Sequence, residues 1–182
     1  MGKLPVVAIV GRQNTGKSSL LNAMAGRRHS IVDPMPGVTR DRVSVIVSYR
    51  GTAFELVDTG GIGLRPGDAF YEEVERQIER AIQDAEVVLF LVDMKSGPVG
   101  LDRQIAARFR DKKVLLVANK ADNFDMEKGV TEFYELGLGE AVPVAAAHMR
   151  NIRDLTERVA SMLPPAPLPS QGLSIEIGRA HV

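Results

Sequence analysis

Short apolar runs alternate along the chain with longer segments of mixed polarity. Val6–Val10, Val87–Val92 and Val114–Ala118 are continuous and apolar, which is typical of strands buried on both faces of a sheet. Ala141–Ala145 is a weaker run of the same kind. These runs predict four strands of a mostly parallel sheet.

A second kind of strand pattern lies between the first two runs. In Val43–Tyr49 apolar residues alternate with more polar neighbours, and a further strand is expected over Ala53–Val57. Arg50 and Gly51 lie between the two segments as a short turn. The two strands are therefore expected to form an antiparallel hairpin.

Four segments carry apolar residues at helical spacing: Ser18–Ala25, Tyr71–Asp84, Leu101–Phe109 and Asn151–Leu163. Helices that alternate with buried strands favour the α/β class. We predict a mostly parallel six-stranded sheet with one antiparallel edge strand and helices on both faces.

The composition of the chain changes after Leu163. Four of the next six residues are proline, namely Pro164, Pro165, Pro167 and Pro169. We expect one folded domain over residues 1–163 and a proline-rich linker or tail over residues 164–182. Gly172–Val182 is too short to fold alone, so it is either the start of a following domain or a foreign segment.

Composition narrows the class of protein. The 182 residues suit one α/β domain, and 45% hydrophobic with 25% charged residues is typical of a soluble globular protein. Lys+Arg and Asp+Glu both number 23, so overall charge gives no sign of nucleic-acid or membrane binding, although a local patch stays open. The absence of cysteine excludes disulfides and thiolate sites and fits a cytoplasmic protein. No apolar run is long enough to span a membrane.

The segment Gly11–Ser18 matches the phosphate-loop pattern G-x-x-x-x-G-K-S/T, between a buried strand and a helix. Its glycines let backbone N–H groups converge on an anion, and the helix N-terminus adds partial positive charge. Lys17 is expected to reach the β- and γ-phosphates, and the Ser18 hydroxyl to bind Mg²⁺. The alternative is a glycine-rich turn that binds nothing. The predicted phosphate-binding residues are Gly11, Asn14, Thr15, Gly16, Lys17, Ser18 and Ser19.

Asn119–Asp122 reads N-K-x-D directly after a predicted strand. The Asp122 carboxylate could accept both N1–H and N2–H of guanine, a donor pair that adenine lacks. Asn119 would brace the loops, and the stem of Lys120 would cover one face of the base. The alternative is a solvated polar loop.

Asp58–Gly61 has the form D-x-x-G and also follows a predicted strand. Asp58 could hold Mg²⁺ through water, and the backbone N–H of a following glycine could sense a γ-phosphate. The alternative is an ordinary Asp-Gly turn.

Taken in this order, the three motifs resemble the Ras-like, translation-factor-related P-loop GTPases over roughly residues 5–163. Four segments sharpen the resemblance to the first GTPase domain of the bacterial Der (EngA) family, which is Era-like: Pro36–Arg42, Asp58–Ile62, Phe133–Gly139 and Ala146–His148. The resemblance implies a Ras-like P-loop GTPase fold with GTP or GDP as ligand. Members of this family carry two tandem GTPase domains and a KH-like domain, and act in assembly of the large ribosomal subunit.

The resemblance also implies roles for single residues. Thr39 would be the switch I threonine that closes on Mg²⁺ and the γ-phosphate, so Ser18, Thr39 and Asp58 would serve the metal. The backbone N–H of Gly61 would sense the γ-phosphate. The N–H of Ala146 would donate to guanine O6, with Ala147 beside it in the base loop.

Some positions depart from the family pattern. Gln13 and Thr15 stand where the family has Pro and Val, and Ala145 stands where it has Ser. The family's second GTPase domain has no counterpart in these residues, so the chain is expected to be a piece of a longer protein whose partners include rRNA.

Ile62 occupies the position at which Ras carries the glutamine that orients the attacking water. The chain resembles, at Asn14, the bacterial GTPases that use K⁺ in place of an arginine finger, which carry Asn at this phosphate-loop position. The resemblance implies that the side-chain oxygen of Asn14, with phosphate oxygens and carbonyls around Val32–Met35, could hold K⁺. Lys17, Thr39, Gly61 and Asn14 are therefore the predicted catalytic groups of a slow, K⁺-stimulated GTPase.

Alternatives remain for several of these residues. Asn14 could serve only to stabilise the loop turn, and the chain could be a regulatory module that binds guanine nucleotides with negligible hydrolysis. His148 could be structural, or it could contact the nucleotide or RNA. His29 and a group of arginines could contact rRNA or be solvated; the arginines are Arg27, Arg28, Arg40 and Arg42.

Overall fold

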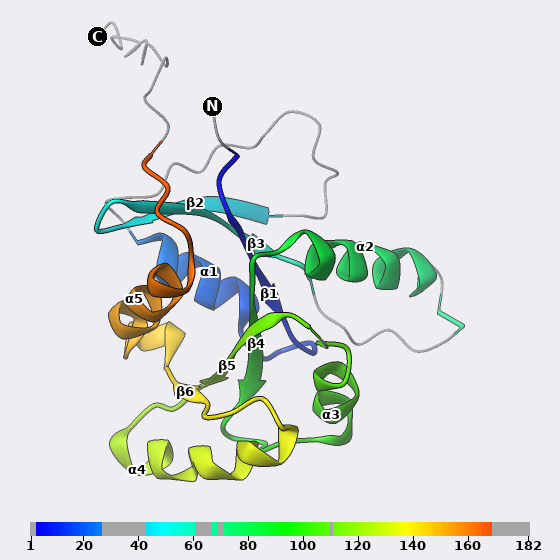
Figure 1. Ribbon diagram of the computed structural model, residues 1–182. Helices are drawn as coiled ribbons and strands as arrows, with labels where there is room; N and C mark the ends of the chain where they lie inside the picture. The colour runs from blue at the N-terminus through cyan, green and yellow to red at the C-terminus, as the bar shows by residue number, and fades with distance from the viewer. Residues whose placement is uncertain (1–2, 27–42, 61–66, 69–70, 110, 169–182) are drawn as a thin grey trace, which may run out of the picture.

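A six-stranded sheet in the order β2-β3-β1-β4-β5-β6 runs through the molecule (Figure 1). The computed structural model describes residues 3–26, 43–60, 67–68, 71–109 and 111–168. The strands are β1 (Val6–Val10), β2 (Val43–Tyr49), β3 (Thr52–Asp58), β4 (Val87–Asp93), β5 (Lys113–Asn119) and β6 (Val142–Pro143). All neighbouring pairs are parallel except β2 with β3. The predicted sheet is thereby confirmed, including its antiparallel edge strand.

The β2–β3 hairpin closes through a two-residue turn at Arg50 and Gly51. Tyr49 pairs with Thr52, and both turn residues have positive φ, 46° and 83°. Positive φ at both central residues matches the twist of the flanking strands, which is why such turns form tight hairpins.

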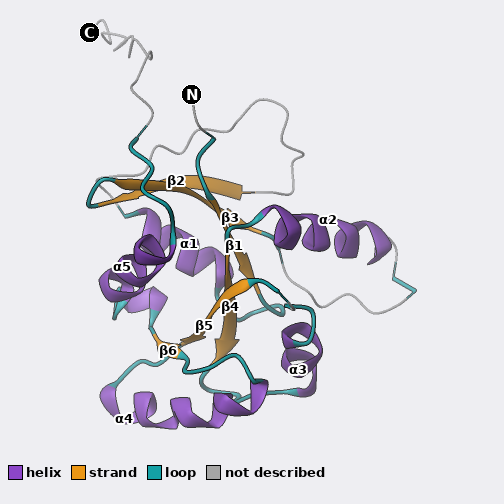
Figure 2. Cartoon of the chain, viewed as in Figure 1, coloured by secondary structure: helices purple, strands orange, loops and turns teal. Residues whose placement is uncertain are grey.

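Helices cover both faces of the sheet (Figure 2). They are α1 (Lys17–Ala25), α2 (Tyr71–Asp84), α3 (Gly100–Ala106), α4 (Phe124–Glu127) and α5 (Ile152–Met162), with 3₁₀ turns η1 (Lys128–Leu136) and η2 (Ala146–His148). Within β1, Val7 and Ile9 pack with α1 and α5, whereas Ala8 and Val10 pack with α2, α3 and η1. Both faces of the central strands are therefore buried, as their continuous apolar sequence requires.

The structure shifts some element boundaries and adds a helical segment. The predicted helix Leu101–Phe109 spans Gly100–Ala106, and the weak strand Ala141–Ala145 is reduced to Val142–Pro143. The helical stretch from Phe124 to Leu136 was not predicted. Its first part is a single α-turn, and its 3₁₀ part has few residues per turn, so neither shows the apolar period of a long α-helix.

The first residues of the proline-rich segment lie against the sheet. Leu163 is buried, and the carbonyl oxygen of Ala166 accepts a hydrogen bond from the N–H of Ala53 at 2.5 Å. Residues 169–182 lie outside the described part of the chain, so the nature of that tail stays a prediction. Across the residues that are described, every helix is too short or too polar to cross a membrane.

The parallel strands bring their carboxyl ends to one edge of the sheet. Ile9 in β1 is in register with Asp58 in β3, and Asp93 at the end of β4 is in register with Asn119 at the end of β5. Ligands of open α/β sheets bind outside this edge, where the strand order reverses. The phosphate loop, the D-x-x-G motif and the N-K-x-D motif all start here, at the ends of β1, β3 and β5.

Candidate functional site

The phosphate-loop pattern leads from β1 into α1 and needs its glycines for space and conformation. A Cβ atom on Gly11 would lie 2.5 Å from the carbonyl oxygen of Leu91, in the neighbouring strand β4. Gly16 has φ of 93°, and a Cβ there would collide with the side-chain amide of Asn119. These two positions accept no other residue without movement of the loop.

Lys17 is the buried cation of this loop. Its side chain is only 6% exposed, and Nζ donates to the carbonyl oxygen of Arg12 at 2.9 Å. The hydroxyl of Thr15 donates to the same oxygen at 3.0 Å. Burial lowers the pKa of Lys17, an effect that the Asp58 carboxylate opposes and the Arg12 charge reinforces. An anion placed here would compensate a charge that the fold has partly desolvated.

Ser18 and Asp58 lie together although they are forty positions apart in the chain. The Ser18 hydroxyl donates to Oδ2 of Asp58 at 2.9 Å, and the N–H of Gly60 donates to Oδ1 at 2.9 Å. Thr59 donates through its hydroxyl to the carbonyl oxygen of Ile9 at 2.8 Å, which fixes the start of this loop on β1. A hydroxyl beside a carboxylate is a donor set that suits Mg²⁺.

Asn119 joins three loops with one buried side chain. Its Nδ2 donates to the carbonyl oxygen of Thr15 at 2.9 Å, and its Oδ1 accepts from the N–H of Ala146 at 3.0 Å. The residue is 3% exposed. The expected bracing of the loops by Asn119 is thus present, and the Ala146 N–H that was predicted to face guanine O6 donates to Asn119 in this structure.

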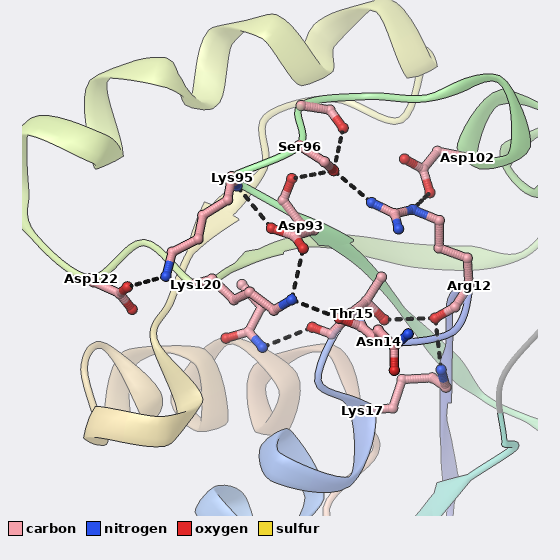
Figure 3. Close-up of polar contacts among 12 residues, drawn as sticks. Arg12, Asn14, Thr15, Lys17, Asp93, Lys95, Ser96, Asp102, Lys120 and Asp122 are labelled. Carbon is pink, nitrogen blue, oxygen red and sulfur yellow. Dashed lines mark hydrogen bonds and ion pairs between the residues drawn. The ribbon is translucent and has the colours of Figure 1, made fainter.

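Lys120 crosses from the end of β5 to the phosphate loop. Its Nζ donates to the carbonyl oxygen of Asn14 and to Oδ2 of Asp93, both at 2.7 Å (Figure 3). Partial burial alone would raise the pKa of Asp93, but hydrogen bonds from Lys120 and from the N–H of Lys95 lower it below its ordinary value. The ionised carboxylate therefore holds the Lys120 stem in place along the loop.

Asp122 is more open and is paired differently. Nζ of Lys95 lies 2.8 Å from Oδ2, and Nε2 of His148 lies 3.9 Å from Oδ1. The hydrogen bond and charge of Lys95 lower the pKa of Asp122, so the carboxylate is ionised at neutral pH. The side chain of Lys95 reaches across from the loop that follows β4 (Figure 3).

Arg12 ties the phosphate loop to α3. Its Nη2 donates to Oγ of Ser96 at 2.5 Å, and its Nε faces Oδ1 of Asp102 at 3.3 Å, as an ion pair without the alignment of a hydrogen bond. Asp102 is fully buried and accepts the N–H of Val99 at 3.0 Å. Burial raises the pKa of Asp102, although Val99 and Arg12 both oppose the rise.

The structure places the remaining predicted residues as follows. Ser18, Ser19, Asn14, Ala147 and His148 are exposed at the carboxyl edge of the sheet or beside it. Thr39, Gly61 and Ile62 lie outside the described residues, as do Val32–Met35, His29, Arg27, Arg28, Arg40 and Arg42.

Sequence reasoning did not single out Asp93, Lys95 or Asp102 and assigned no role to Arg12. Asp93 could have been recognised from the sequence, because it ends a buried strand as Asp58 and Asn119 do. Lys95 and Asp102 carried none, since their partners are far away in sequence.

Comparison with known proteins places this arrangement in a family. Residues 6–120 match the family described as 50S ribosome-binding GTPase. The chain is 44% identical to GTPase Der of Moorella thermoacetica over 98% of its own length and 42% of the relative's. Its identity to GTPase Der of Pelotomaculum thermopropionicum is 45%, with the same coverage. The chain therefore spans about two fifths of the length of these curated relatives.

Solved structures agree with the fold. Era of Aquifex aeolicus bound to GDP and AlF4⁻ is similar with a TM-score of 0.76 and 29% identity, over 94% of this chain and 61% of that one. Era in complex with MgGDPNP and a segment of 16S ribosomal RNA has the same TM-score and identity, over 95% and 61%. The G domain of the T. maritima FeoB iron transporter, at 23% identity and a TM-score of 0.65 over 88% of this chain and 99% of that one, shares the fold. The expected Ras-like GTPase fold is confirmed.

Proposed function

The chain belongs to the family of 50S ribosome-binding GTPases, with Der proteins among its relatives, and on that premise we propose that it binds GTP and GDP with Mg²⁺ and hydrolyses GTP as a molecular switch. Residues 1–163 are the proposed GTPase domain. The proposal requires one ligand to meet the phosphate loop, the metal residues and the base-reading loop at once.

The observation that carries the proposal is the bridge made by Asn119. One amide joins Thr15 of the phosphate loop to Ala146 of the base loop, at 2.9 and 3.0 Å. A nucleotide has a phosphate end and a base end at a set separation, so a protein that reads both must hold its two loops at a matching separation. A buried side-chain amide that makes two hydrogen bonds holds the loops at that separation at low entropic cost.

On the phosphate side, the residues have divided tasks. Lys17 is to exchange its bond to the Arg12 carbonyl for the β- and γ-phosphates. Ser18 and Asp58, already in contact, are to hold Mg²⁺, Ser18 directly and Asp58 through water, with Thr39 as a further ligand. When bound there, Mg²⁺ supplies neutralising charge to the phosphate oxygens. The N–H of Gly61 is to sense the γ-phosphate.

Asn14 is proposed to help hold K⁺, which supplies positive charge where Ile62 leaves no water-orienting glutamine. The side chain of Asn14 is exposed, while its backbone carbonyl is bonded to Lys120 at 2.7 Å. The contact with Lys120 thus leaves the side-chain oxygen of Asn14 available for an ion. We expect slow GTP turnover, with a higher rate in KCl than in NaCl.

On the base side, Asp122 is to accept N1–H and N2–H of guanine, with the Lys120 stem over one face of the ring. The N–H of Ala146 and the adjoining Ala147 are to line the O6 edge. Since Ala146 already donates to Asn119, O6 would share that N–H with the amide oxygen.

For the whole protein we propose a cytoplasmic, Der-type assembly factor with a second GTPase domain and a KH-like domain. Its partner would be the large ribosomal subunit and its rRNA. The support is the identity to GTPase Der, of which this chain covers 42%, and the family described as 50S ribosome-binding. The segment 164–182 would be the linker toward the next domain.

A second candidate is a guanine-nucleotide-binding module with negligible hydrolysis. Ile62 favours it, because an isoleucine side chain cannot hydrogen-bond the attacking water. Turnover measurements with saturating GTP and fixed Mg²⁺ in KCl and in NaCl separate the candidates. Turnover that stays at the uncatalysed rate in both salts selects the module.

Calorimetric titration with GTP, GDP, ATP and XDP tests the proposed ligand. We expect the wild-type chain to bind GTP and GDP and to reject ATP. Asp122→Asn should weaken the binding of GDP and strengthen the binding of XDP, because an amide N–H can donate to the O2 of xanthine. Unchanged guanine preference in Asp122→Asn would refute the role of this carboxylate.

Ser18→Ala tests the metal residues separately. The variant should lose the Mg²⁺-dependent part of GTP binding while keeping the Mg²⁺-independent part. Ser19→Ala is the matched control for Mg²⁺ dependence, because Ser19 is another exposed serine in the same helical turn that is assigned to phosphate and not to the metal. Equal Mg²⁺ dependence in the two variants would contradict the assignment of Ser18.

A further inference from the structure

Lys95 makes a contact that neither the phosphate loop nor the base loop requires. Its backbone N–H donates to Oδ1 of Asp93 at 2.8 Å, which fixes the start of the side chain at the end of β4. From there its Nζ reaches Oδ2 of Asp122 at 2.8 Å. The contact joins two strand ends that are also linked through Lys120 and Asp93.

The contact is strong in geometry but open to solvent. The side chains of Lys95 and Asp122 are 56% and 31% exposed. An exposed ion pair gives little net stability, and a lysine side chain changes rotamer readily. Lys95 can therefore leave the carboxylate at little cost, but while it stays it uses one of the two oxygens.

Guanine needs both oxygens of Asp122, since its N1–H and 2-amino group lie side by side on one edge. Hypoxanthine lacks the 2-amino group and needs only one oxygen. His148 stands 3.9 Å from the other oxygen, too far for a close hydrogen bond, so Lys95 is the close competitor among the described residues.

We propose that Lys95 competes with the 2-amino group of guanine for Asp122 and so limits how strongly the site prefers guanine to hypoxanthine. The inference rests on the proposed function, in which Asp122 reads the base. Lys95 is a positioning residue that acts on the nucleotide only through Asp122. Binding of a guanine nucleotide displaces its ammonium, whereas an inosine nucleotide leaves it in place.

The test is the ratio of Kd for IDP to Kd for GDP, measured by calorimetry at fixed Mg²⁺. Lys95→Met keeps the aliphatic stem and removes the charge, and Lys95→Arg keeps a cation. The matched control is Lys128→Met, which breaks another exposed Lys–Asp pair at 2.7 Å, between Lys128 at the start of η1 and Asp125 in α4.

Lys95→Met should raise the IDP-to-GDP ratio by about two- to fivefold, the range set by an exposed ion pair. GDP should bind more tightly, with IDP unchanged. Lys95→Arg and Lys128→Met should keep the wild-type ratio. Added NaCl should raise the ratio in the wild type toward that of Lys95→Met, because salt screens the competing pair.

A ratio in Lys95→Met that equals or falls below the wild-type ratio overturns the inference, since Lys95 would then be neutral or would help Asp122 to read guanine. The proposed function fails by a different result, namely wild-type protein that binds ADP as well as GDP, or an Asp122→Asn variant that keeps guanine preference. Guanine selectivity that depends on Asp122, together with an unmoved ratio in Lys95→Met, defeats this inference alone.

Discussion

The phosphate end and the base end of the site differ in how far their charged side chains are exposed to water. At the phosphate end, Lys17 and Asp58 are buried and bonded within the loops. At the base end, Asp122 is partly exposed and paired with a solvated lysine, Lys95. Both ends carry charged side chains, but only those at the phosphate end are buried.

The difference determines what a substitution reports. A buried polar group is part of the fold, so truncating it changes stability together with binding, unless an apolar side chain of similar length takes its place. An exposed pair adds little to stability, so its removal changes binding alone. Asn119 belongs to the buried class although it lies in the same motif as Asp122, three residues earlier.

The largest expected effect is that of Asn119→Ala. It leaves the Thr15 carbonyl and the Ala146 N–H without their buried partner, at a cost of about 2–4 kcal/mol in the free energy of unfolding. Nucleotide binding should fall with it, because the two loops lose their bridge. Urea unfolding and GDP titration measure the two effects.

The control for this variant is Asn123→Ala, in the same loop. Asn123 accepts the N–H of Met126 at 2.9 Å as an exposed helix cap, so about 1 kcal/mol is expected. Equal losses of stability in the two variants would remove the distinction between buried brace and exposed loop.

Lys17→Met should separate binding from stability at the phosphate end. GTP affinity should fall by about 1.5–3 kcal/mol, the worth of a charge-assisted bond. The unfolding free energy should stay or rise, because a cation whose pKa is lowered by burial is replaced by an apolar side chain of similar length.

Lys112→Met is the comparison variant for Lys17. Lys112 also donates to backbone carbonyls, those of Gln83 and Ala85 at 2.7 and 3.2 Å, but away from the site. It should leave GTP affinity unchanged. A Lys17→Met protein that binds GTP like the parent would show that this loop does not bind phosphate.

Arg12→Ala should destabilise by about 1–3 kcal/mol at neutral pH, because it leaves the Asp102 carboxylate buried without its cation. The loss should shrink on acidification. Burial already raises the pKa of Asp102, and without Arg12 it rises further, so the folded state takes up a proton before the unfolded state does.

Urea unfolding in steps from neutral pH down to the ordinary aspartate pKa of about 4 measures this trend. Arg103→Ala, which breaks the exposed pair with Glu135, should cost little at any pH. A penalty for Arg12→Ala that does not depend on pH would contradict a role for the Asp102 charge.

The smallest effect concerns K⁺. Hydrolysis should be about tenfold faster in KCl than in NaCl, or roughly 1.4 kcal/mol of barrier. Asn14 has φ of 63°, a conformation that suits asparagine or glycine, so Asn14→Gly removes the side chain without backbone strain. The variant should lose the difference between salts and keep its GDP affinity.

Asn14→Ala complements this variant, because alanine is strained at a positive φ. A loss of stability only in Asn14→Ala, with the salt effect intact in Asn14→Gly, would assign Asn14 a purely structural role in the loop turn.

The predictable parts of the molecule are those encoded in contiguous residues. Each buried strand was visible as one apolar run, and the β2–β3 hairpin as two strands with Arg50-Gly51 between them. The helical stretch from Phe124 to Leu136 was not predicted, because its short α-turn and 3₁₀ turns do not show apolar residues at the spacing of a long α-helix. Likewise, the motifs could be recognised because each is encoded in a few successive residues, eight in the case of the phosphate loop.

The sequence by itself determined the class of fold, the three motifs and the family to which they belong. Only the tertiary structure decided which distant side chains meet: Asn119 with Thr15, Lys95 with Asp122, and Arg12 with Asp102. The physical reason is the strand order, which places β1 between β3 and β4 and β5 beside β4. Loops far apart in the chain share one edge of the sheet, and their side chains pair according to distances that no local pattern contains.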